Sequence, residues 1–336
     1  MTGLYNLVII GATGSLGGQC LEIVRRYPEQ FRVVGLSAHR NRENLEQLAL
    51  EFGARQTLLS SSSPEELIEL VDERVDHLLL LDHGLGSREL CLKALAMSKR
   101  VSIANKELIV CHGQELVYLA KECQSELIPL DSELNALHQC LRGEALSDVS
   151  RVIITASGGP FLNRADLGQV TPEQALRHPN WMMGAKTSVD SATLVNKALE
   201  VIQVQQLLGI PYDRIEVRLH PESLVHAIVE FCDGSSKMLA YHPDMRIALG
   251  YALFYPQRAP GLLSANKQPF DYDRPINLSP LEAGRFPCFD TVMDIAHNKP
   301  EQLSRVLEND QVAIQKFLKG DIQFDEIGDF LLKGIL

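Results

Sequence analysis

Two carboxylates stand two residues apart in the stretch "IPLDSELNAL", where Asp131 and Glu133 follow a short apolar run. In an extended chain, side chains at i and i+2 point to the same side, so both acids would converge on a hard cation such as Mg²⁺ or Mn²⁺. The alternative interpretation is helix capping, in which Asp131 or Ser132 satisfies free N–H groups at the start of the next segment. A third acid would decide in favour of a metal site.

The stretch "SVDSATLVNKALE", residues 188–200, ends on such an acid and has the pattern of an amphipathic helix after Ser191. The apolar positions that this helix would bury are Leu194, Val195, Ala198, Val201 and Ile202. Its other face would carry Thr193, Asn196, Lys197 and Glu200. Such a face is normally solvated, but this one combines an amide, one cation and one acid in place of long mixed charges. Two interpretations of this helix face therefore remain, a solvated face and a functional one.

A glycine turn and a lone tryptophan lie near these residues in the sequence. Ser157 stands in "ASGGPF" after an apolar run, an arrangement that forms anion-binding nests. Trp181, the only tryptophan of the chain, lies in "RHPNWMMG" between two helical segments. A core tryptophan is the ordinary interpretation. The other is a lid, because Pro179 and Gly184 bound a bulky apolar tip that would close over a ligand and exclude water.

The N-terminal stretch "IIGATGSLG" places Gly11, Gly14 and Gly17 directly after a strand and at the start of a helix. Small residues there let the backbone approach a pyrophosphate at the helix N-terminus, which predicts a dinucleotide site. After the next strand, "AHRNR" offers Arg40 and Arg42 where NAD-specific proteins place an acid. Guanidinium groups pair with phosphate, so the loop favours NADP, and a solvated basic loop is the alternative.

The elements that would position these residues indicate an α/β fold. Short apolar runs alternate with amphipathic stretches from Leu4 to Ala104, which predicts an N-terminal Rossmann-like, doubly wound parallel sheet. A second α/β region begins near Leu127, and "LVHAIVEF" and "SKMLAY" read as a hairpin through Gly234. We therefore expect an NADP-binding domain at 1–126, a catalytic domain with a flap at 127–287, and a reduced C-terminal helical region at 288–336, with helices at 290–296 and 310–318.

Length, charge and cysteine usage exclude several classes of protein. A chain of 336 residues is long enough for two or three domains. Its net charge of −11 provides no basic footprint for nucleic acid, and no apolar run approaches the roughly 20 residues needed to span a bilayer. The seven cysteines are scattered and never form C-x-x-C, which favours reduced thiols. We expect a cytoplasmic protein that binds neither nucleic acid nor membrane.

Seven ordered motifs resemble the 1-deoxy-D-xylulose 5-phosphate reductoisomerase family. They are "GATGSLG", "ANKE", "PLDSELN", "ASGGPF", "RHPNWMMG", "SVDSATLVNKALE" and "HPESLVHAIV". The resemblance runs from about residue 5 to 255 and more faintly to the end. It implies an enzyme of the methylerythritol phosphate route to isoprenoids, which uses NADPH and Mg²⁺ or Mn²⁺ to rearrange and reduce a small phosphorylated sugar.

The resemblance also implies roles for individual residues. The metal ligands would be Asp131, Glu133 and Glu200. The substrate phosphate would be held by Ser157, Ser191, Asn196 and Lys197, with Lys106, Ser132, His178 and the flap residue Trp181 also at the substrate. Among these, the catalytic residues would be Lys106, Glu133, His178 and Glu200. NADPH would contact Thr13, Gly14, Ser15, Leu16, His39, Arg40, Asn41, Asn105, Glu107 and Gly184.

The chain departs from the family pattern in three places. His39 stands where the family often has glycine, and "LDHGLGS" replaces a Gly-Ala-Ala-Gly loop near the nicotinamide side. "LENDQVAIQKFL" stands in place of an Asn-Ala-Ala-Asn-Glu motif, and the chain then stops dozens of residues early, so we expect most of the terminal helical domain to be missing. A paralogue acting on a related phosphorylated keto-sugar, or a silent nucleotide-binding protein, are the alternative functions. The three retained acids disfavour the silent protein.

The last residues, "FDEIGDFLLKGIL", are too apolar for a solvated end. Ile327, Phe330, Leu331, Ile335 and Leu336 would either fold back over the surface left by the shortened region or pack on a second chain. We favour a homodimer, with a docked tail as the alternative.

Overall fold

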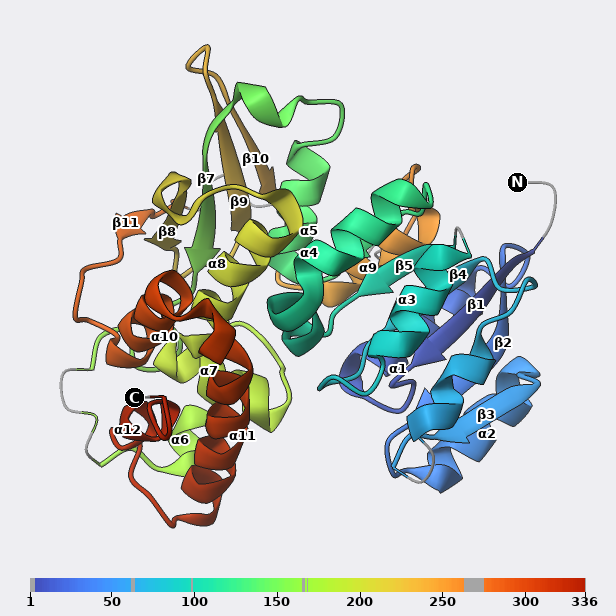
Figure 1. Cartoon of the computed structure of the whole chain (residues 1–336), viewed down its shortest axis with the longest axis horizontal. Helices are drawn as coiled ribbons and strands as arrows, with labels where there is room; N and C mark the ends of the chain where they lie inside the picture. Colours follow the sequence, from blue (N-terminus) through green and yellow to red (C-terminus); the bar gives the residue numbers. More distant parts are fainter. Residues whose placement is uncertain are drawn as a thin grey trace. The chain divides into compact units, whose positions relative to one another are not determined.

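The computed structural model describes residues 4–61, 64–97, 99–164, 167, 169–262 and 275–335. It consists of two compact units, which Figure 1 shows coloured along the chain. The first unit combines Met1–His138 with Asp244–Pro269, and the second combines Gln139–Pro243 with Phe270–Leu336. Each unit contains one sheet and its own helices.

The sheet of the first unit is parallel throughout, with the strand order β3-β2-β1-β4-β5-β6. The strands are β1 (Tyr5–Ile10), β2 (Phe31–Ala38), β3 (Gln56–Leu59), β4 (His77–Leu80), β5 (Arg100–Ile103) and β6 (Leu127–Pro129). The helices are α1 (Ser15–Arg26), α2 (Arg42–Phe52), α3 (Arg88–Ala96), α4 (Lys106–Glu122), α5 (Ser132–Cys140) and α9 (Met245–Phe254), with the 3-10 helix η1 (Pro64–Leu70). This order is that of a doubly wound dinucleotide-binding fold, which confirms the predicted class.

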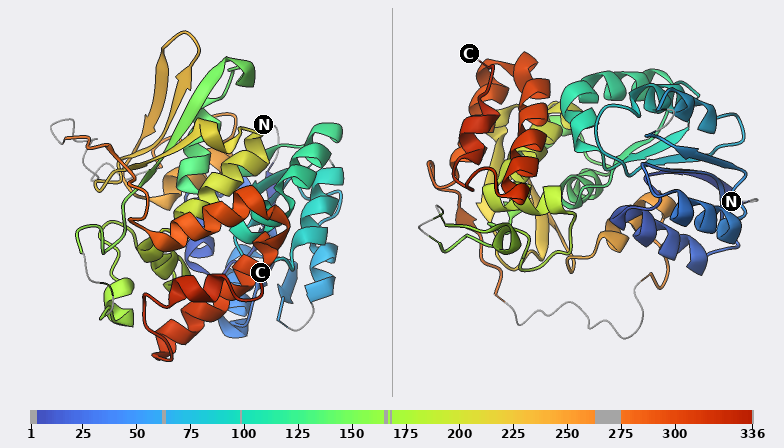
Figure 2. Two further views of the ribbon diagram at one scale, coloured as in Figure 1. Left: turned by 60° about the vertical axis from the view of Figure 1, so that its left-hand side comes forward. Right: turned by 90° about the horizontal axis from the view of Figure 1, so that it is seen from below.

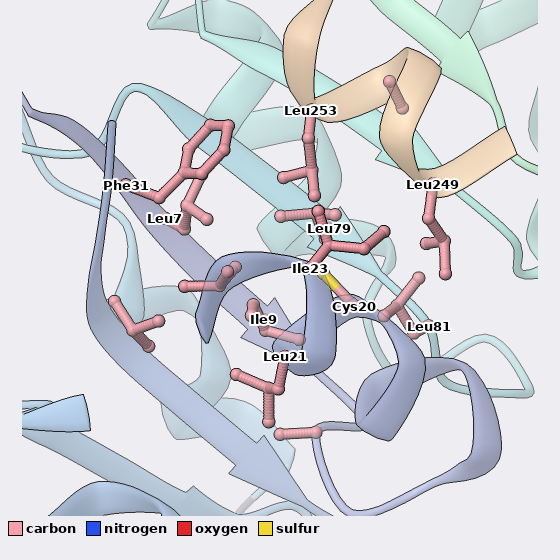
Figure 3. Close-up of a cluster of buried hydrophobic side chains, with 14 of the residues drawn as sticks. Leu7, Ile9, Cys20, Leu21, Ile23, Phe31, Leu79, Leu81, Leu249 and Leu253 are labelled. Atoms are coloured by element: carbon pink, nitrogen blue, oxygen red, sulfur yellow. The ribbon is translucent and has the colours of Figure 1, made fainter. Parts of the chain in front are cut away.

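The core of this unit lies between β1, α1 and α9 (Figure 3). Ile9 of β1 and Leu21 of α1 are fully buried there, together with Leu249 and Leu253 of α9. Burial of each such leucine contributes about 1.5 to 3 kcal/mol. No element was predicted for α9, because a short, mostly apolar run has no clear periodicity that separates a buried helix from a strand.

One strand lies in a different sheet from the one that we expected. We assigned "LIPL" to the second region, but β6 pairs in parallel with β5 at the edge of the first sheet. Only three residues pair, Leu127 with Val101, Ile128 with Ser102 and Pro129 with Ile103. Asp131 and Glu133 therefore follow the last strand of the first sheet and belong to the first unit.

The sheet of the second unit is mixed, with the order β10-β9-β7-β8-β11. The strands are β7 (Val149–Ala156), β8 (Ile215–Leu219), β9 (Val225–Phe231), β10 (Ser236–Ala240) and β11 (Ser279–Pro280). The predicted hairpin is confirmed, since β9 and β10 are antiparallel and Gly234 turns with φ of 85°. The helices are α6 (Pro172–Ala175), α7 (Ala185–Thr193), α8 (Val195–Leu208), α10 (Pro287–Asn298), α11 (Leu303–Lys319) and α12 (Ile327–Leu331), with 3-10 turns η2 (Leu146–Asp148), η3 (Tyr212–Arg214) and η4 (Pro300–Gln302).

The C-terminal tail packs on α10 and α11 of its own unit (Figure 2, red). Phe324, Ile327 and Leu331 are buried, and Asn309 of α11 donates hydrogen bonds to the main-chain oxygens of Leu331 (3.1 Å) and Lys333 (2.8 Å). The docked tail, which was the alternative expectation, is therefore confirmed for the described residues. Leu336 lies outside them.

Helix length and composition also bear on membrane association. In the part of the chain that the structure describes, no helix has both the length and the apolar character needed to cross a membrane.

Candidate active site

The turn between β1 and α1 forms a cradle of backbone at the carboxyl end of the first sheet. Gly11 has φ of +81°, and a Cβ on Gly17 would lie 2.4 Å from the Gly11 oxygen. Gly14 is the N-cap of α1 and provides no side-chain cap, so the first N–H groups of the helix face outward. Thr13 and Ser15 flank it. These features suit a pyrophosphate, which binds to N–H groups at a helix N-terminus.

The loop after β2 carries the residues predicted to read the adenosine end of the coenzyme. His39 and Arg40 are both exposed, and His39 Nδ1 lies 3.4 Å from Ser60 Oγ. Asn41 caps α2, because its Oδ1 accepts from the Asn44 main-chain N–H at 3.1 Å. Arg42 lies 3.8 Å from Glu46 within α2. His39, Arg40 and Arg42 are thus all exposed to solvent, where a ligand phosphate would approach.

The divergent loop after β4 is fixed by a buried network. Asn105 Nδ2 donates to Asp82 Oδ1 (3.2 Å) and the Gly84 oxygen (2.7 Å), while its Oδ1 accepts from the Leu108 N–H at 2.9 Å. Burial raises the pKa of Asp82, against the hydrogen bonds from Asn105 and Ser87. The side chain of Asn105 is fully used within the protein, so a coenzyme contact at this residue would use its main chain.

Glu107, one residue into α4 from Lys106, presents the opposite situation. Its Oε2 is buried and has no hydrogen-bond partner among the residues that the structure describes. The imidazole of His83 lies at a longer distance, with its Nδ1 4.0 Å from this oxygen. A buried, unsatisfied carboxylate oxygen costs free energy unless a ligand donates to it. Glu107 therefore fits the ligand-contact role implied for it.

Local contacts hold the two acids at the end of β6. Asp131 Oδ1 accepts from the Ser132 N–H at 3.1 Å, at the start of α5, whereas a capping side chain accepts from an N–H two or three residues on. Its Oδ2 forms an ion pair with Lys106, and Ser132 Oγ donates to Glu133 Oε2. One oxygen of Asp131 thus contacts the first N–H of α5, and the other oxygen faces the Lys106 ammonium. This arrangement brings together Lys106, Asp131, Ser132 and Glu133 within the first unit.

The predicted single helix after Ser191 is two helices. Leu194 adopts φ of +59° between α7 and α8, so Thr193 ends α7 and does not share the face of α8. Thr193 is buried, and its hydroxyl donates to the Val189 oxygen at 3.1 Å. A left-handed leucine is strained and persists where surrounding packing enforces it. The prediction of one continuous polar face was therefore wrong for Thr193.

The other three residues of that face lie together on α8. Lys197 and Glu200 are 5% and 1% exposed, which excludes a solvated face. Glu200 forms an ion pair with Lys197 and accepts a hydrogen bond from Asn196 Nδ2. Asn196 Oδ1 is buried without a hydrogen-bond partner among the described residues. Burying a cation and an anion together costs desolvation free energy, which is typical of a functional site.

Ser157 and His178 form a hydrogen-bonded pair. His178 Nδ1 accepts from the main-chain N–H groups of Asn180 (3.2 Å) and Trp181 (3.0 Å), so the ring proton lies on Nε2. Nε2 donates to Ser157 Oγ at 2.9 Å, and the Gly159 N–H donates to the same oxygen at 3.1 Å. The Ser157 hydroxyl proton is then directed to a further acceptor, such as a phosphate oxygen.

Gly159 brings this turn next to Ser191. A Cβ on Gly159 would lie 2.7 Å from the Ser191 main-chain oxygen, and Gly159 has φ of +64°. The turn therefore packs directly on the end of α7 because the residue there is glycine. Ser157 was predicted from the sequence, but Gly159 was not. The second glycine of "SGGP" is the feature that could have indicated it.

The segment from His178 to Gly184 has an anchored base and an exposed tip. Asn180 Nδ2 donates to the Pro221 oxygen (2.6 Å) and to Ser223 Oγ (2.9 Å), an anchor that sequence reasoning missed. Trp181 is half-buried, with its ring edge-on to His226 at 6.0 Å, and Met182 is 96% exposed. Trp181 is thus not a core residue. Gly184 is the N-cap of α7.

Three family models match parts of this amino-acid sequence. The family model "1-deoxy-D-xylulose 5-phosphate reductoisomerase" matches residues 7–80, its C-terminal domain model matches 127–208, and "DXP reductoisomerase C-terminal domain" matches 241–335. A 1-deoxy-D-xylulose 5-phosphate reductoisomerase of Clostridium botulinum is 36% identical, covering 98% of this chain and 91% of the relative. One from Leifsonia xyli is 45% identical, covering 84% and 77%.

Solved structures give the same similarity. A DOX-P reductoisomerase in complex with NADPH, fosmidomycin and magnesium is 30% identical, with a TM-score of 0.88 over 99% of this chain and 90% of that one. The Zymomonas mobilis enzyme in complex with NADPH is also 30% identical, with a TM-score of 0.85 over 98% and 91%.

These matches bear on the expected loss of the C-terminal domain. The chain is shorter than these relatives, yet the C-terminal family model matches residues 241–335, where α10, α11 and α12 lie. The loss of most of this helical domain therefore stays a prediction, since the match covers α10, α11 and α12 in a chain that is shorter than its relatives. The described C-terminal helices pack around Ile314, Phe317 and Ile327.

Proposed function

Because the chain belongs to the 1-deoxy-D-xylulose 5-phosphate reductoisomerase family, we propose that it converts 1-deoxy-D-xylulose 5-phosphate to 2-C-methyl-D-erythritol 4-phosphate. The reaction uses NADPH and Mg²⁺ or Mn²⁺, as the solved relatives with NADPH and magnesium suggest. The observation that carries the proposal is the buried group on α8, in which Glu200 pairs with Lys197 and Asn196. A binding module has no need to bury this combination of charges.

The proposed metal ligands are Asp131, Glu133 and Glu200. Their donor set fits a hard divalent cation, because all three supply carboxylate oxygens. When bound, the ion acts as a Lewis acid that stabilises the negative charge developing as the carbon skeleton rearranges. Lys106 and Lys197 ion-pair with two of these acids and so limit the repulsion between carboxylates before a metal binds.

The proposed phosphate site consists of Ser157, Ser191, Asn196 and Lys197. The Ser157 hydroxyl donates to a phosphate oxygen while His178 holds it from the other side. Lys197 supplies the cation that the dianion needs, and a phosphate held at a distance from the reacting carbons orients them. His178 and Trp181 belong to the segment that closes over the substrate and excludes water, and Lys106 and Ser132 contact the substrate in the first unit.

The proposed coenzyme site follows the carboxyl edge of the first sheet. The pyrophosphate lies on the cradle of Thr13, Gly14, Ser15 and Leu16, where a Cβ on Gly17 would not fit. The nicotinamide end contacts Asn105, Glu107 and Gly184. NADPH supplies the hydride that reduces the rearranged aldehyde.

Consumption of NADPH tests this activity directly. The chain is mixed with 1-deoxy-D-xylulose 5-phosphate, NADPH and Mg²⁺ or Mn²⁺, and absorbance of the reduced coenzyme is followed, with NADH and metal-free samples as controls. We expect oxidation only when substrate and metal are both present. Coenzyme binding without turnover would instead identify a silent nucleotide-binding protein, and turnover of another phosphorylated keto-sugar alone would identify a paralogue.

Arg40→Ala tests the coenzyme preference. We expect the native chain to prefer NADPH over NADH, and we expect this variant to lose about tenfold in NADPH affinity, the value of one charge-assisted hydrogen bond to the 2′-phosphate. Arg32→Ala is the matched control, because Arg32 is an exposed arginine near the start of β2, whereas the loop follows the end of this strand. The measurement is KM for both coenzymes at low salt. Equal use of NADPH and NADH by the native chain would refute the assignment.

The cytoplasm and a homodimer remain parts of the proposal. The seven free cysteines support a reducing compartment. The tail packs within its own unit, so a dimer would have to use another surface. Light scattering of the full chain tests this: a monomer mass at micromolar concentration would rule out the dimer.

A further inference from the structure

A buried group of charges links the C-terminal helices to α7. Lys186 Nζ lies 2.8 Å from Asp190 Oδ2 on the same helix and 2.7 Å from Asp310 Oδ2 on α11. The side chains of Asp190 and Asp310 are 5% and 2% exposed, whereas that of Lys186 is 26% exposed. This group contributes none of the residues that the proposed reaction uses.

The group holds one cation for two carboxylates. The second oxygens of Asp190 and Asp310 are buried, and neither has a hydrogen-bond donor among the described residues. A single proton shared by the two carboxyl groups would satisfy both oxygens and leave one negative charge opposite the Lys186 ammonium. With both acids ionised, a net negative charge would remain buried.

The charged group can affect ligand binding because it lies on α7, a helix that carries a proposed phosphate ligand. The helix begins after Gly184, at the end of the Trp181 segment, and its last turn contains Ser191, the residue after Asp190. Gly159 packs on the Ser191 main chain, so the position of α7 also fixes the Ser157 turn. We propose that Asp310 is a positioning residue, which holds α7 on α11 through Lys186 and Asp190 and thereby places Ser191 for the substrate phosphate. The role of Ser191 in this inference rests on the proposed function.

The pKa of Asp310 determines the pH range over which the charge of this group changes. Burial, and then the neighbouring Asp190 carboxylate, raise the pKa of Asp310 to about 7, against the opposing effect of Lys186. The Cys288 thiol of α10, whose pKa burial raises to about 12, interacts with Asp310 and also with Asp329 of α12. Glu301 of η4 is exposed.

The sign of the pH effect follows from the direction of this shift. The folded state binds the proton more tightly than the unfolded chain, where an aspartate has a pKa of about 4. The stabilisation is therefore complete below about pH 4 and is lost as the pH rises through about 7. Between pH 6 and 8 the folding equilibrium constant should fall about tenfold for this group alone.

Asp310→Asn is the test, because an amide donates a hydrogen bond to Asp190 at every pH. Glu308→Gln, at an exposed position of α11 with a side chain 68% exposed, is the matched control. We measure urea unfolding at pH 6 and 8, and the affinity for sulfate, a dianion that does not titrate in this range. Relative to Asp310→Asn, the native chain should lose about tenfold in folding constant and up to about tenfold in sulfate affinity from pH 6 to 8. Glu308→Gln should follow the native chain.

Each result decides a separate part of the inference. Parallel unfolding profiles for the native chain and Asp310→Asn would overturn the shared proton. Different unfolding profiles with parallel sulfate profiles would overturn the positioning role and leave a purely structural group. Absence of sulfate binding at pH 6 would count against the proposed phosphate site, while the unfolding profiles would still decide the role of Asp310. If Asp310→Asn does not fold, a carbon NMR titration of the native Asp310 carboxyl replaces it, and a midpoint near 4 overturns the inference.

Discussion

Glu200→Gln should abolish metal-dependent turnover and leave the fold in place. The side chain is 1% exposed, and it forms an ion pair with Lys197. Glutamine has the same shape and offers an oxygen to Lys197, so the helix keeps its packing. It removes one of the three charges that we assign to the cation, and kcat/KM should fall by at least about 1000-fold, roughly 4 kcal/mol in the barrier. Metal affinity should fall in parallel.

Steady-state kinetics and calorimetric titration with Mn²⁺ measure the two effects, and circular dichroism checks the fold. Glu122→Gln, at an exposed position near the end of α4, is the control for loss of a negative charge and should behave as the native chain does. Turnover and metal affinity that stay at native values in Glu200→Gln would remove Glu200 from the proposed metal site.

Local patterns in the sequence were sufficient for the first helices of the first unit. The first amphipathic stretches expected between the apolar runs are α1 and α2. Their N-caps are Gly14 and Asn41, and the apolar spacing marks their buried faces. The three-residue strand β6 was placed in the wrong region, because nothing in "LIPL" specifies whether the strand continues the first sheet beside β5 or begins a second sheet. Pairing between strands is a tertiary property that periodicity does not encode.

In the candidate site, too, residue types could be predicted from the sequence, whereas burial and backbone conformation could not. Residue types identified Glu200 and Lys197, but their burial could not be read from a helix whose polar face looked solvated. The break at Leu194 was also hidden, because a leucine with positive φ violates local preference and is imposed by packing. Asp310 is the clearest case, since only the fold brings it to a lysine 124 residues earlier in the chain.

Gly17→Ala should unfold or loosen the coenzyme domain, although alanine is the better helix former. The added Cβ would lie 2.4 Å from the Gly11 oxygen and 2.5 Å from the Ala12 oxygen, and neither backbone atom moves without shifting β1 from α1. We expect a loss of about 3 kcal/mol or more in the free energy of unfolding, as for severe overpacking, and a weaker affinity for NADPH.

Gly18→Ala provides the matched control in the same helix. A Cβ on Gly18 would meet no atom within 4 Å, so this change should stabilise the protein by about 0.5 to 1 kcal/mol through helix propensity. Urea unfolding and NADPH fluorescence titration of both variants separate the two effects. If Gly17→Ala matched Gly18→Ala in stability and NADPH affinity, the close approach of α1 to the turn would not be required. The glycines would then serve only the conformation of the loop, and the coenzyme cradle would lose its structural basis.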